Sequence, residues 1–221
     1  MLDASTLPHV AAADVAAMVP PATSALIVVD VQTDFAAPFG LIGRHGADMS
    51  TVEPAIDRIE TLIDAARTAG VTIGFMRVVT QPETDSAALK TLMVRRGTPG
   101  AEGICRVEGG GADYYRVAPE AGDIEIGKLL FNSFHGTDLD EQLRARGVDT
   151  VVMTGLSTDC CVDATARDAF HRGYNVLVVS DACAAYEPEV HASALSLMEK
   201  NVAMLVESEA VATAWHAAAR E

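Results

Sequence analysis

The segment that most restricts the fold is the run ALIVVDVQ at residues 25–32, in which Asp30 is the only charged residue. A strand that is apolar on both faces is typical of a parallel sheet covered by helices on both sides. A half-exposed strand alternates apolar and polar residues instead. The run therefore predicts a buried strand of an α/β sheet.

Strand-like and helix-like segments alternate along the rest of the chain. The segment 51–70 has apolar residues at helical spacing and ends at Gly70. Further strands are expected at 71–79, 123–128, 149–155, 174–182 and 202–208, and further helices at 138–147, 161–173, 189–201 and from there towards residue 221. This order predicts a three-layer α/β/α fold with a mostly parallel, doubly wound (Rossmann-like), six-stranded sheet.

The length of 221 residues favours one domain with one sizeable core. Residues 1–22, rich in alanine and ended by Pro20 and Pro21, are expected to form an N-terminal arm or a short surface helix, and residues 23–221 a single domain. The stretch 80–122 is rich in glycine and charge and is expected to be a long structureless segment. Such segments often bind substrate, so residues 81–122 and 35–44 are expected to determine specificity.

Charge and hydropathy exclude several classes of partner. A formal net charge of −15 disfavours nucleic acid and anionic membrane surfaces. No apolar run approaches the roughly 20 residues of a membrane span, and the N-terminal residues do not resemble a signal peptide. A cytoplasmic protein that acts on a small molecule is expected.

The cysteines and histidines give no sign of a metal site. The four cysteines lack the spacing of a zinc site or a disulfide framework, and the six histidines are scattered along the chain. We therefore expect no metal and no cofactor. Cys105 and Cys183 are interpreted as buried thiols, and His135 as a loop or capping residue.

Three reactive side chains follow three separate predicted strands. Asp30 ends the first, Lys128 ends the third, and Cys160 and Cys161 lie in the turn after the fourth. Ligands of doubly wound folds bind at the carboxyl ends of the strands. A helix N-terminus there would favour a thiolate, a carboxylate could accept the thiol proton, and a lysine would keep that carboxylate ionised. The set predicts acyl transfer with a cysteine nucleophile.

Each residue alone also has a less specific interpretation. Lys128 could be a solvated lysine, and either cysteine could be a small core residue. Asp30 could be the first acid of a phosphatase of the haloacid-dehalogenase type, although Gln32 stands where the second acid would be. A redox pair of adjacent cysteines is a further alternative. Helical spacing does not distinguish Cys160 from Cys161.

Three motifs resemble the isochorismatase-like (cysteine hydrolase) superfamily, over residues 25 to about 205. They are ALIVVDVQTDF, IEIGKLLFNSFHGTDLDEQL and VVMTGLSTDCCVDATARDAFHRGYNVLVVSDACAA. The resemblance implies a triad of Asp30, Lys128 and Cys161, because Cys161 matches the family's Thr-Asp-x-Cys-Val pattern. It also implies a cis peptide at Leu156–Ser157, with the N–H groups of Ser157 and Cys161 forming an oxyanion hole.

The resemblance implies hydrolysis of a small non-peptide amide, carbamoyl or ureido compound through a thioester, with release of ammonia or an amine. The namesake branch, which cleaves the vinyl ether of isochorismate, generally lacks the nucleophilic cysteine. Nicotinamidases carry metal-binding histidines that the stretch RVVTQPETDSAA does not have. Vinyl ether hydrolysis and a catalytically silent binding protein remain the alternatives.

Candidate substrate contacts come from the first motif, the strand ends and the long segment. An arginine could hold a substrate carboxylate through two parallel hydrogen bonds. The candidates are Gln32, Phe35, Arg77, Arg95 and Phe134. The resemblance further implies a homodimer or homotetramer.

Overall fold

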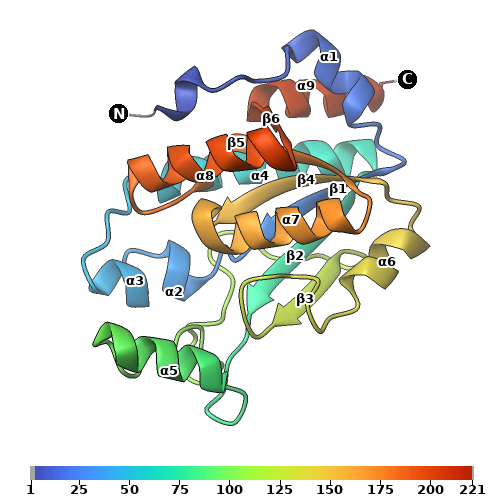
Figure 1. Ribbon diagram of the computed structural model, residues 1–221. Helices are drawn as coiled ribbons and strands as arrows, with labels where there is room; N and C mark the ends of the chain where they lie inside the picture. Colours follow the sequence, from blue (N-terminus) through green and yellow to red (C-terminus); the bar gives the residue numbers. More distant parts are fainter. Residues whose placement is uncertain (1–2, 221) are drawn as a thin grey trace.

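The computed structural model describes residues 3–220. Met1 and Leu2 of the predicted arm and Glu221 of the predicted domain lie outside the described residues. Six parallel strands form one sheet in the order β3-β2-β1-β4-β5-β6 (Figure 1). They are β1 Ser24–Val29, β2 Thr72–Val78, β3 Ile124–Lys128, β4 Thr150–Leu156, β5 Asn175–Ala184 and β6 Met204–Val206. The predicted fold class is confirmed.

Helices cover both faces of the sheet. The α-helices are α1 Ala12–Met18, α2 Thr33–Ala36, α3 Leu41–Arg44, α4 Val52–Ala69, α5 Ala87–Arg96, α6 Leu139–Ala145, α7 Asp163–His171, α8 Pro188–Asn201 and α9 Ser208–Ala218. A 3₁₀ turn, η1 (Ala4–Thr6), and a π-helical turn, η2 (Thr158–Val162), complete the set. Helices α4 and α9 pack on one face of the sheet, and α6, α7 and α8 pack on the other.

The two central strands define the functional edge of the sheet. After β1 the chain moves outwards through β2 to β3, and it then returns to form β4 on the other side of β1. The connection after β1 leads to β2 on one side, and the connection after β4 leads to β5 on the other side. A crevice therefore opens between them at the carboxyl ends of β1 and β4. All six residues of β1 are buried, as its apolar run predicts.

The segment 80–122 is not structureless, so that expectation is wrong. Helix α5 occupies its centre, begins where the Ser86 side chain accepts a hydrogen bond from Leu89 N–H, and ends at Gly97. Gly97 has φ 78°, a left-handed conformation that suits glycine at the end of a helix. None of the residues of α5 is buried. The helix therefore lacks the apolar stripe by which sequence periodicity identifies a helix.

The N-terminal segment packs closely on the rest of the molecule. Val15 and Val19 are buried in the same core as α4 and α9, and Trp215 Nε1 donates to the Val19 carbonyl at 3.0 Å. The separation of the chain into an arm and a domain at residues 22 and 23 stays a prediction. No helix in residues 3–220 combines the length and apolar character that a membrane crossing requires.

Gly155 allows β1 and β4 to come together at the crevice. Its φ is 112°, and a Cβ placed there would overlap the carbonyl oxygen of Val29. We predict that Gly155→Ala lowers the free energy of unfolding by about 3 kcal/mol or more, through backbone strain and overpacking together. Urea denaturation measures this change.

Gly70→Ala is the matched control, because Gly70 has φ 72° but open space where a Cβ would lie. It should cost only about 1–2 kcal/mol, the strain of a left-handed non-glycine residue. Equal costs for the two substitutions would contradict the assigned role of close approach at Gly155.

Candidate active site

Asp30, Lys128 and Cys161 come together at the carboxyl edge of the sheet. Asp30 directly follows β1, Lys128 is the last residue of β3, and Cys161 lies in η2 after β4. Strand β2 lies between β1 and β3, so Asp30 and Lys128 meet across the end of β2. The structure thus unites three residues that are far apart in the sequence.

Asp30 and Lys128 form a buried ion pair. Lys128 Nζ donates to Asp30 Oδ2 at 2.7 Å and to the Leu130 carbonyl at 3.0 Å. The two side chains are 1% and 0% exposed, respectively. Burial is the largest single influence on the pKa of Lys128 and lowers it, but the charge of Asp30, the interaction with Cys161 and the hydrogen bonds to both together raise that pKa above its usual value. Lys128 is therefore a fixed cation.

The Asp30 carboxylate keeps one oxygen free. Within residues 3–220, its buried Oδ1 has no hydrogen-bond partner. Burial raises the pKa of Asp30 above the usual value, although Lys128 and the Cys161 thiol oppose this shift. Asp30 also has φ 53°, which is uncommon for a residue other than glycine. A strained, buried acid with a free oxygen is suited to accept a proton.

The Cys161 thiol faces this pair and is 5% exposed. Its pKa lies well above the usual value, because the interaction with Cys160, burial and the negative charge of Asp30 all favour the protonated form. The sequence predicts that the helix N-terminus lowers the pKa of this thiol, whereas its surroundings raise that pKa. The interaction with Cys160, burial and the adjacent carboxylate outweigh the helix end, so the thiol needs a base.

The backbone before Cys161 presents a free N–H group. The Leu156–Ser157 peptide is cis, as the family resemblance implies. Within residues 3–220, Ser157 N–H has no hydrogen-bond acceptor, whereas the Ser157 carbonyl accepts from the N–H groups of Cys160 and Val162. Ser157 Oγ donates to Asp159 at 2.9 Å. Ser157 N–H is thus available to an oxygen beside Cys161.

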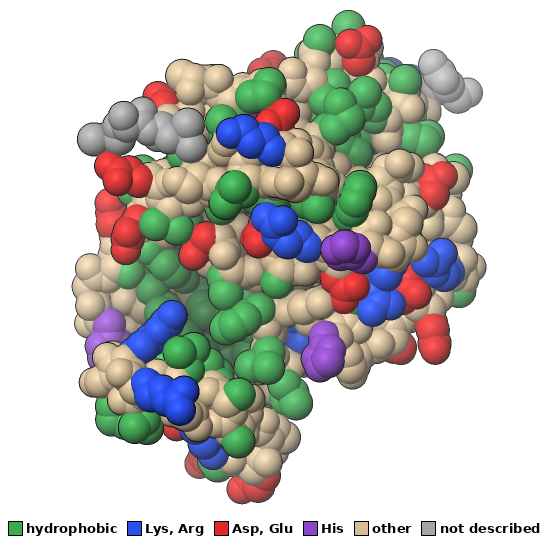
Figure 2. Space-filling model, in the orientation of Figure 1, with side chains coloured by type: hydrophobic (Ala, Val, Ile, Leu, Met, Phe, Trp, Pro, Cys, Tyr) green, Lys and Arg blue, Asp and Glu red, His purple; other side chains and the backbone are tan. Residues whose placement is uncertain are grey.

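A cavity of about 290 Å³ opens onto Cys161. Hydrophobic side chains surround a hollow beside α5 on the face shown in Figure 2. The cavity is lined by Phe35, Ile42, Val78, Thr80, Leu89, Met93, Ala101, Glu102, Ile104, Leu129, Leu130, Phe131, Ser157, Cys160, Cys161 and Tyr186. Of the predicted substrate contacts, the cavity includes Phe35.

Gln32 supports the site without lining the cavity. Its side chain donates to the carbonyls of Val78 and Ala112 and accepts from Val78 N–H, each at 2.8 Å. Asp34 accepts from Cys105 N–H at 2.8 Å and from Leu41 N–H at 3.1 Å. Both residues of the first motif therefore tie the segment 80–122 and α3 to the end of β1.

Arg77, Arg95 and Phe134 do not line the cavity, and their role as substrate contacts stays a prediction. Arg77 pairs with Glu125 at 2.9 Å and lies over the Tyr114 ring. Arg95 is an exposed residue in the last turn of α5. Phe134 is 4% exposed and stacks on Tyr174 in the core. A position near a strand end does not fix the direction of a side chain.

Sequence reasoning missed the segment Leu129–Phe131 and Tyr186 as cavity residues. The signal for the first was available, because LLF follows Lys128 directly at the end of β3. Leu129 and Phe131 are 51% and 44% exposed, which is high for large apolar side chains. Tyr186 follows β5, and the sequence around it gave no comparable signal.

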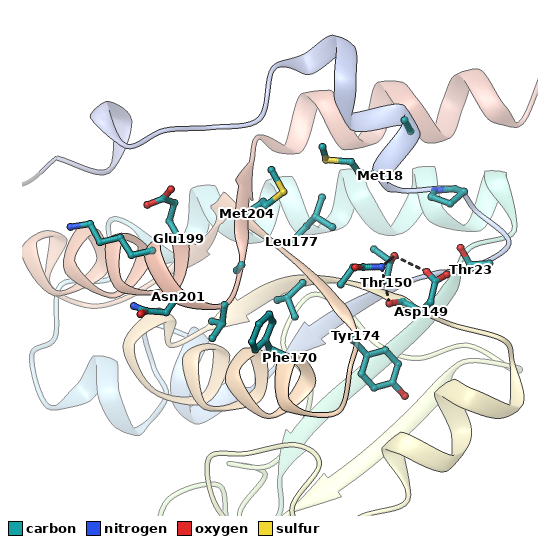
Figure 3. Close-up of a pocket in the computed structure, with 17 residues that line it drawn as sticks. Met18, Thr23, Asp149, Thr150, Phe170, Tyr174, Leu177, Glu199, Asn201 and Met204 are labelled. Atoms are coloured by element: carbon teal, nitrogen blue, oxygen red, sulfur yellow. Dashed lines mark hydrogen bonds between the residues drawn. The ribbon is translucent and has the colours of Figure 1, made fainter.

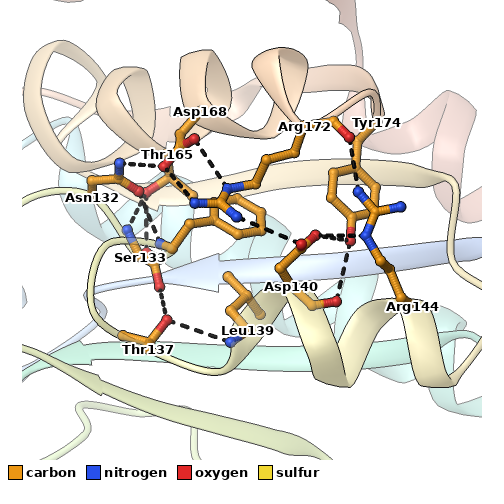
Figure 4. Close-up of polar contacts among 11 residues, drawn as sticks. Asn132, Ser133, Thr137, Leu139, Asp140, Arg144, Thr165, Asp168, Arg172 and Tyr174 are labelled. Atoms are coloured by element: carbon orange, nitrogen blue, oxygen red, sulfur yellow. Dashed lines mark hydrogen bonds and ion pairs between the residues drawn. The ribbon is translucent and has the colours of Figure 1, made fainter.

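A polar network fixes the loop after β3 against α7 (Figure 4). Ser133 N–H donates to Thr165 Oγ1 at 3.1 Å, and Asn132 Nδ2 donates to Asp168 at 2.7 Å. Arg172 pairs with Asp168 at 3.0 Å and with Asp140 of α6 at 3.5 Å. The network positions Lys128 and the apolar residues after it relative to α7, the helix that follows η2.

A second cavity, of about 580 Å³, lies at the opposite edge of the sheet (Figure 3). Thr150 and Asn175, which line it, are the first residues of β4 and β5. None of its lining residues belongs to the triad. Within residues 3–220, no group of three or more His, Cys, Asp or Glu side chains is arranged to hold a metal ion.

The chain resembles characterised amidohydrolases and solved hydrolase structures. It is 40% identical over 195 residues to the ureidoacrylate amidohydrolase RutB of Methylobacterium radiotolerans, covering 81% of this chain and 74% of that protein. A cysteine hydrolase from Pseudomonas syringae pv. phaseolicola superposes with a TM-score of 0.79 at 27% identity, over 96% of this chain and 99% of that chain. An N-carbamoylsarcosine amidase from Thermoplasma acidophilum gives a TM-score of 0.67 at 27% identity, over 85% and 97% of the two chains.

A family model, the isochorismatase domain, matches residues 24–210. This range begins with β1 and ends within α9, so it includes every strand and all three residues of the buried cluster. The chain belongs to the isochorismatase family of hydrolases, as its three motifs indicated.

Proposed function

We propose that this hydrolase of non-peptide C–N bonds cleaves a small amide, carbamoyl or ureido compound through a thioester at Cys161. The observation that carries the proposal is the buried Lys128–Asp30 pair, whose carboxylate interacts with the Cys161 thiol at the end of a cavity. The similarity to ureidoacrylate amidohydrolases and to an N-carbamoylsarcosine amidase supports the same reaction class.

The reaction begins with proton transfer from Cys161 Sγ to Asp30 Oδ1. The resulting thiolate attacks the carbonyl carbon, and the electron pair of the C=O bond moves to oxygen. Ser157 N–H and Cys161 N–H donate to this oxyanion. Lys128 stays protonated and balances the negative charge that moves between the thiolate and the carboxylate.

The tetrahedral intermediate then breaks its C–N bond. Asp30 returns the proton to the leaving nitrogen, which departs as ammonia or an amine, and the acyl group remains on Cys161 as a thioester. Asp30, again ionised, deprotonates a water molecule that attacks the thioester. The C–S bond breaks, Cys161 regains its proton from Asp30, and the acid product leaves.

The two alternative functions have less support. Vinyl ether hydrolysis does not require a cysteine at this position, and the amidohydrolase relatives favour C–N cleavage instead. A silent binding protein has no need of a buried acid with a free oxygen beside a thiol. The homodimer or homotetramer, the cytoplasmic location, and the absence of nucleic-acid and membrane partners stay predictions.

The adjacent cysteines offer a matched test of the nucleophile. We predict that Cys161→Ala lowers kcat by about 10⁴-fold or more, because it removes the atom that forms the thioester. Cys160→Ala should lower it by less than about tenfold, since Cys160 lines the cavity without bonding to Asp30. Release of ammonia or amine from a panel of amides and ureides measures both rates, and circular dichroism checks the folds. Retained turnover in Cys161→Ala would refute the covalent mechanism.

The pH dependence tests the role of Asp30 as the base. The active form needs ionised Asp30, so kcat/KM should fall as the pH drops through a pKa above the ordinary value of an aspartate. Lys128→Met removes the cation that stabilises this carboxylate. The pKa of Asp30 should then rise further, and the acid limb should move to higher pH. Lys128→Arg keeps the charge and should move the limb less. A limb that moves to lower pH in Lys128→Met would contradict this assignment.

A further inference from the structure

We infer that the substrate is an uncharged amide or ureide whose substituent is apolar, such as a branched alkyl or aryl group. This inference rests on the proposed function and names the substrate class of the same site. It separates this chain from its ureidoacrylate-hydrolysing relatives, because ureidoacrylate carries a carboxylate. The distinction depends on the wall of the cavity beyond the reacting thiol.

The cavity wall beyond Cys161 is built from large apolar side chains supplied by four regions of the chain. They are Phe35 and Ile42 from the segment after β1, Leu89 and Met93 from α5, Ile104 from the loop that follows α5, and Leu129, Leu130 and Phe131 from the loop after β3. Leu89 and Met93 of α5 are only partly buried. An apolar substituent would cover them and gain hydrophobic stabilisation, whereas a charged group would lose its hydration there.

The few hydroxyl groups of the wall are already engaged. Thr80 Oγ1 donates to the Ile104 carbonyl at 2.6 Å, and Tyr186 OH donates to the Phe35 carbonyl at 3.0 Å. Ser157 Oγ donates to Asp159. Free donors such as Ser157 N–H therefore lie at the reacting end of the cavity, where they suit a carbonyl oxygen but leave a distant carboxylate without partners.

The charges around the cavity also oppose an anionic substrate. No lysine or arginine is among its lining residues, whereas Glu102 is one of them. Two arginines close to the lining residues pair with acids, Arg77 with Glu125 and Arg106 with Asp85. Arg95 and Arg96, in the last turn of α5, are exposed to solvent and lie outside the lining. Lys128 is committed to Asp30 beneath the thiol. Recognition of a carboxylate in proteins generally uses a cation, most often an arginine, and the wall supplies none.

The size of the cavity fits such a substituent. An apolar cavity of about 150 Å³ can hold benzene, and this one has about 290 Å³. The space accommodates a ring or branched chain together with the amide or ureido group that reaches Cys161.

The first test compares 3-ureidoacrylate with its methyl ester, which has the same skeleton without the charge. We expect kcat/KM for the ester to exceed that for the acid by about 100-fold or more, because an unpaired carboxylate would lie in an apolar wall beside Glu102. Phenylurea, which is neutral and apolar, should likewise be hydrolysed in preference to the acid. Faster hydrolysis of the acid would overturn the inference and leave the cysteine mechanism standing.

A pair of variants on α5 shows whether the cavity wall sets this preference. Met93→Arg places a cation in the wall and should lower the ester-to-acid ratio by about tenfold or more. Leu92→Arg adds the same charge on the same helix at a residue outside the cavity lining, and should leave the ratio unchanged. Equal effects of the two variants would mean that long-range charge, not the wall, controls selection.

Alkylation of Cys161 gives a readout that does not depend on turnover. Iodoacetamide and iodoacetate share a reactive carbon and differ in charge. Relative to a free thiol, Cys161 should prefer iodoacetamide by about 100-fold or more, with Cys161→Ala as the control for the site of labelling. If neither ureide is hydrolysed but this preference holds, the proposed function fails and the charge selection stands. Absence of the preference overturns the inference.

Discussion

The buried ion pair between Lys128 and Asp30 is the interaction on which the site depends. Two charges removed from water are costly, and they are tolerated because they lie 2.7 Å apart and Lys128 also donates to a carbonyl. Asp30 leaves one oxygen unpaired, which adds to the cost. The fold therefore holds an acid whose pKa is raised by burial and which has an unpaired oxygen, and such a group is suited to take a proton from the neighbouring thiol.

The order of the strands explains why the Lys128–Asp30 pair lies beside η2, which contains Cys161. Strands β1 and β4 are adjacent in space although β2 and β3 lie between them in the sequence. Gly155 allows β4 to approach the Val29 carbonyl closely, and the next peptide turns the chain into η2. Asp30 leaves β1 in a left-handed conformation at the same level. Two neighbouring backbones thus bend at one point, and the acid and the thiol both project into the crevice.

The sequence predicted the parts of this structure that repeat a strong physical pattern. Apolar runs and helical spacing identified the six strands and the helices on both faces, because those segments bury their side chains in the core. The motif around Cys161 predicts this cysteine, and not Cys160, as the nucleophile, which periodicity alone does not do. Helix α5 was not predicted, because none of its residues is buried in the core and it therefore has no apolar stripe that faces the core. Its apolar residues Leu89 and Met93 line the cavity instead. The pKa of Cys161 depends on the interaction with Cys160, on burial and on Asp30, and the last two follow from the fold rather than from the local sequence.

The predicted substrate contacts Arg77 and Phe134 lie outside the cavity lining for a related reason. Arg77 and Phe134 lie near strand ends, but the direction of each side chain is set by its partners, Glu125 and Tyr114 for the first and Tyr174 for the second. The residues that do line the cavity belong to connections whose side chains are only partly buried, such as Leu129, Phe131 and those of α5. Core packing places few demands on these positions, so they can change without loss of the sheet or the buried pair. One scaffold can thereby keep the buried pair and the thiol while the side chains of the cavity wall change.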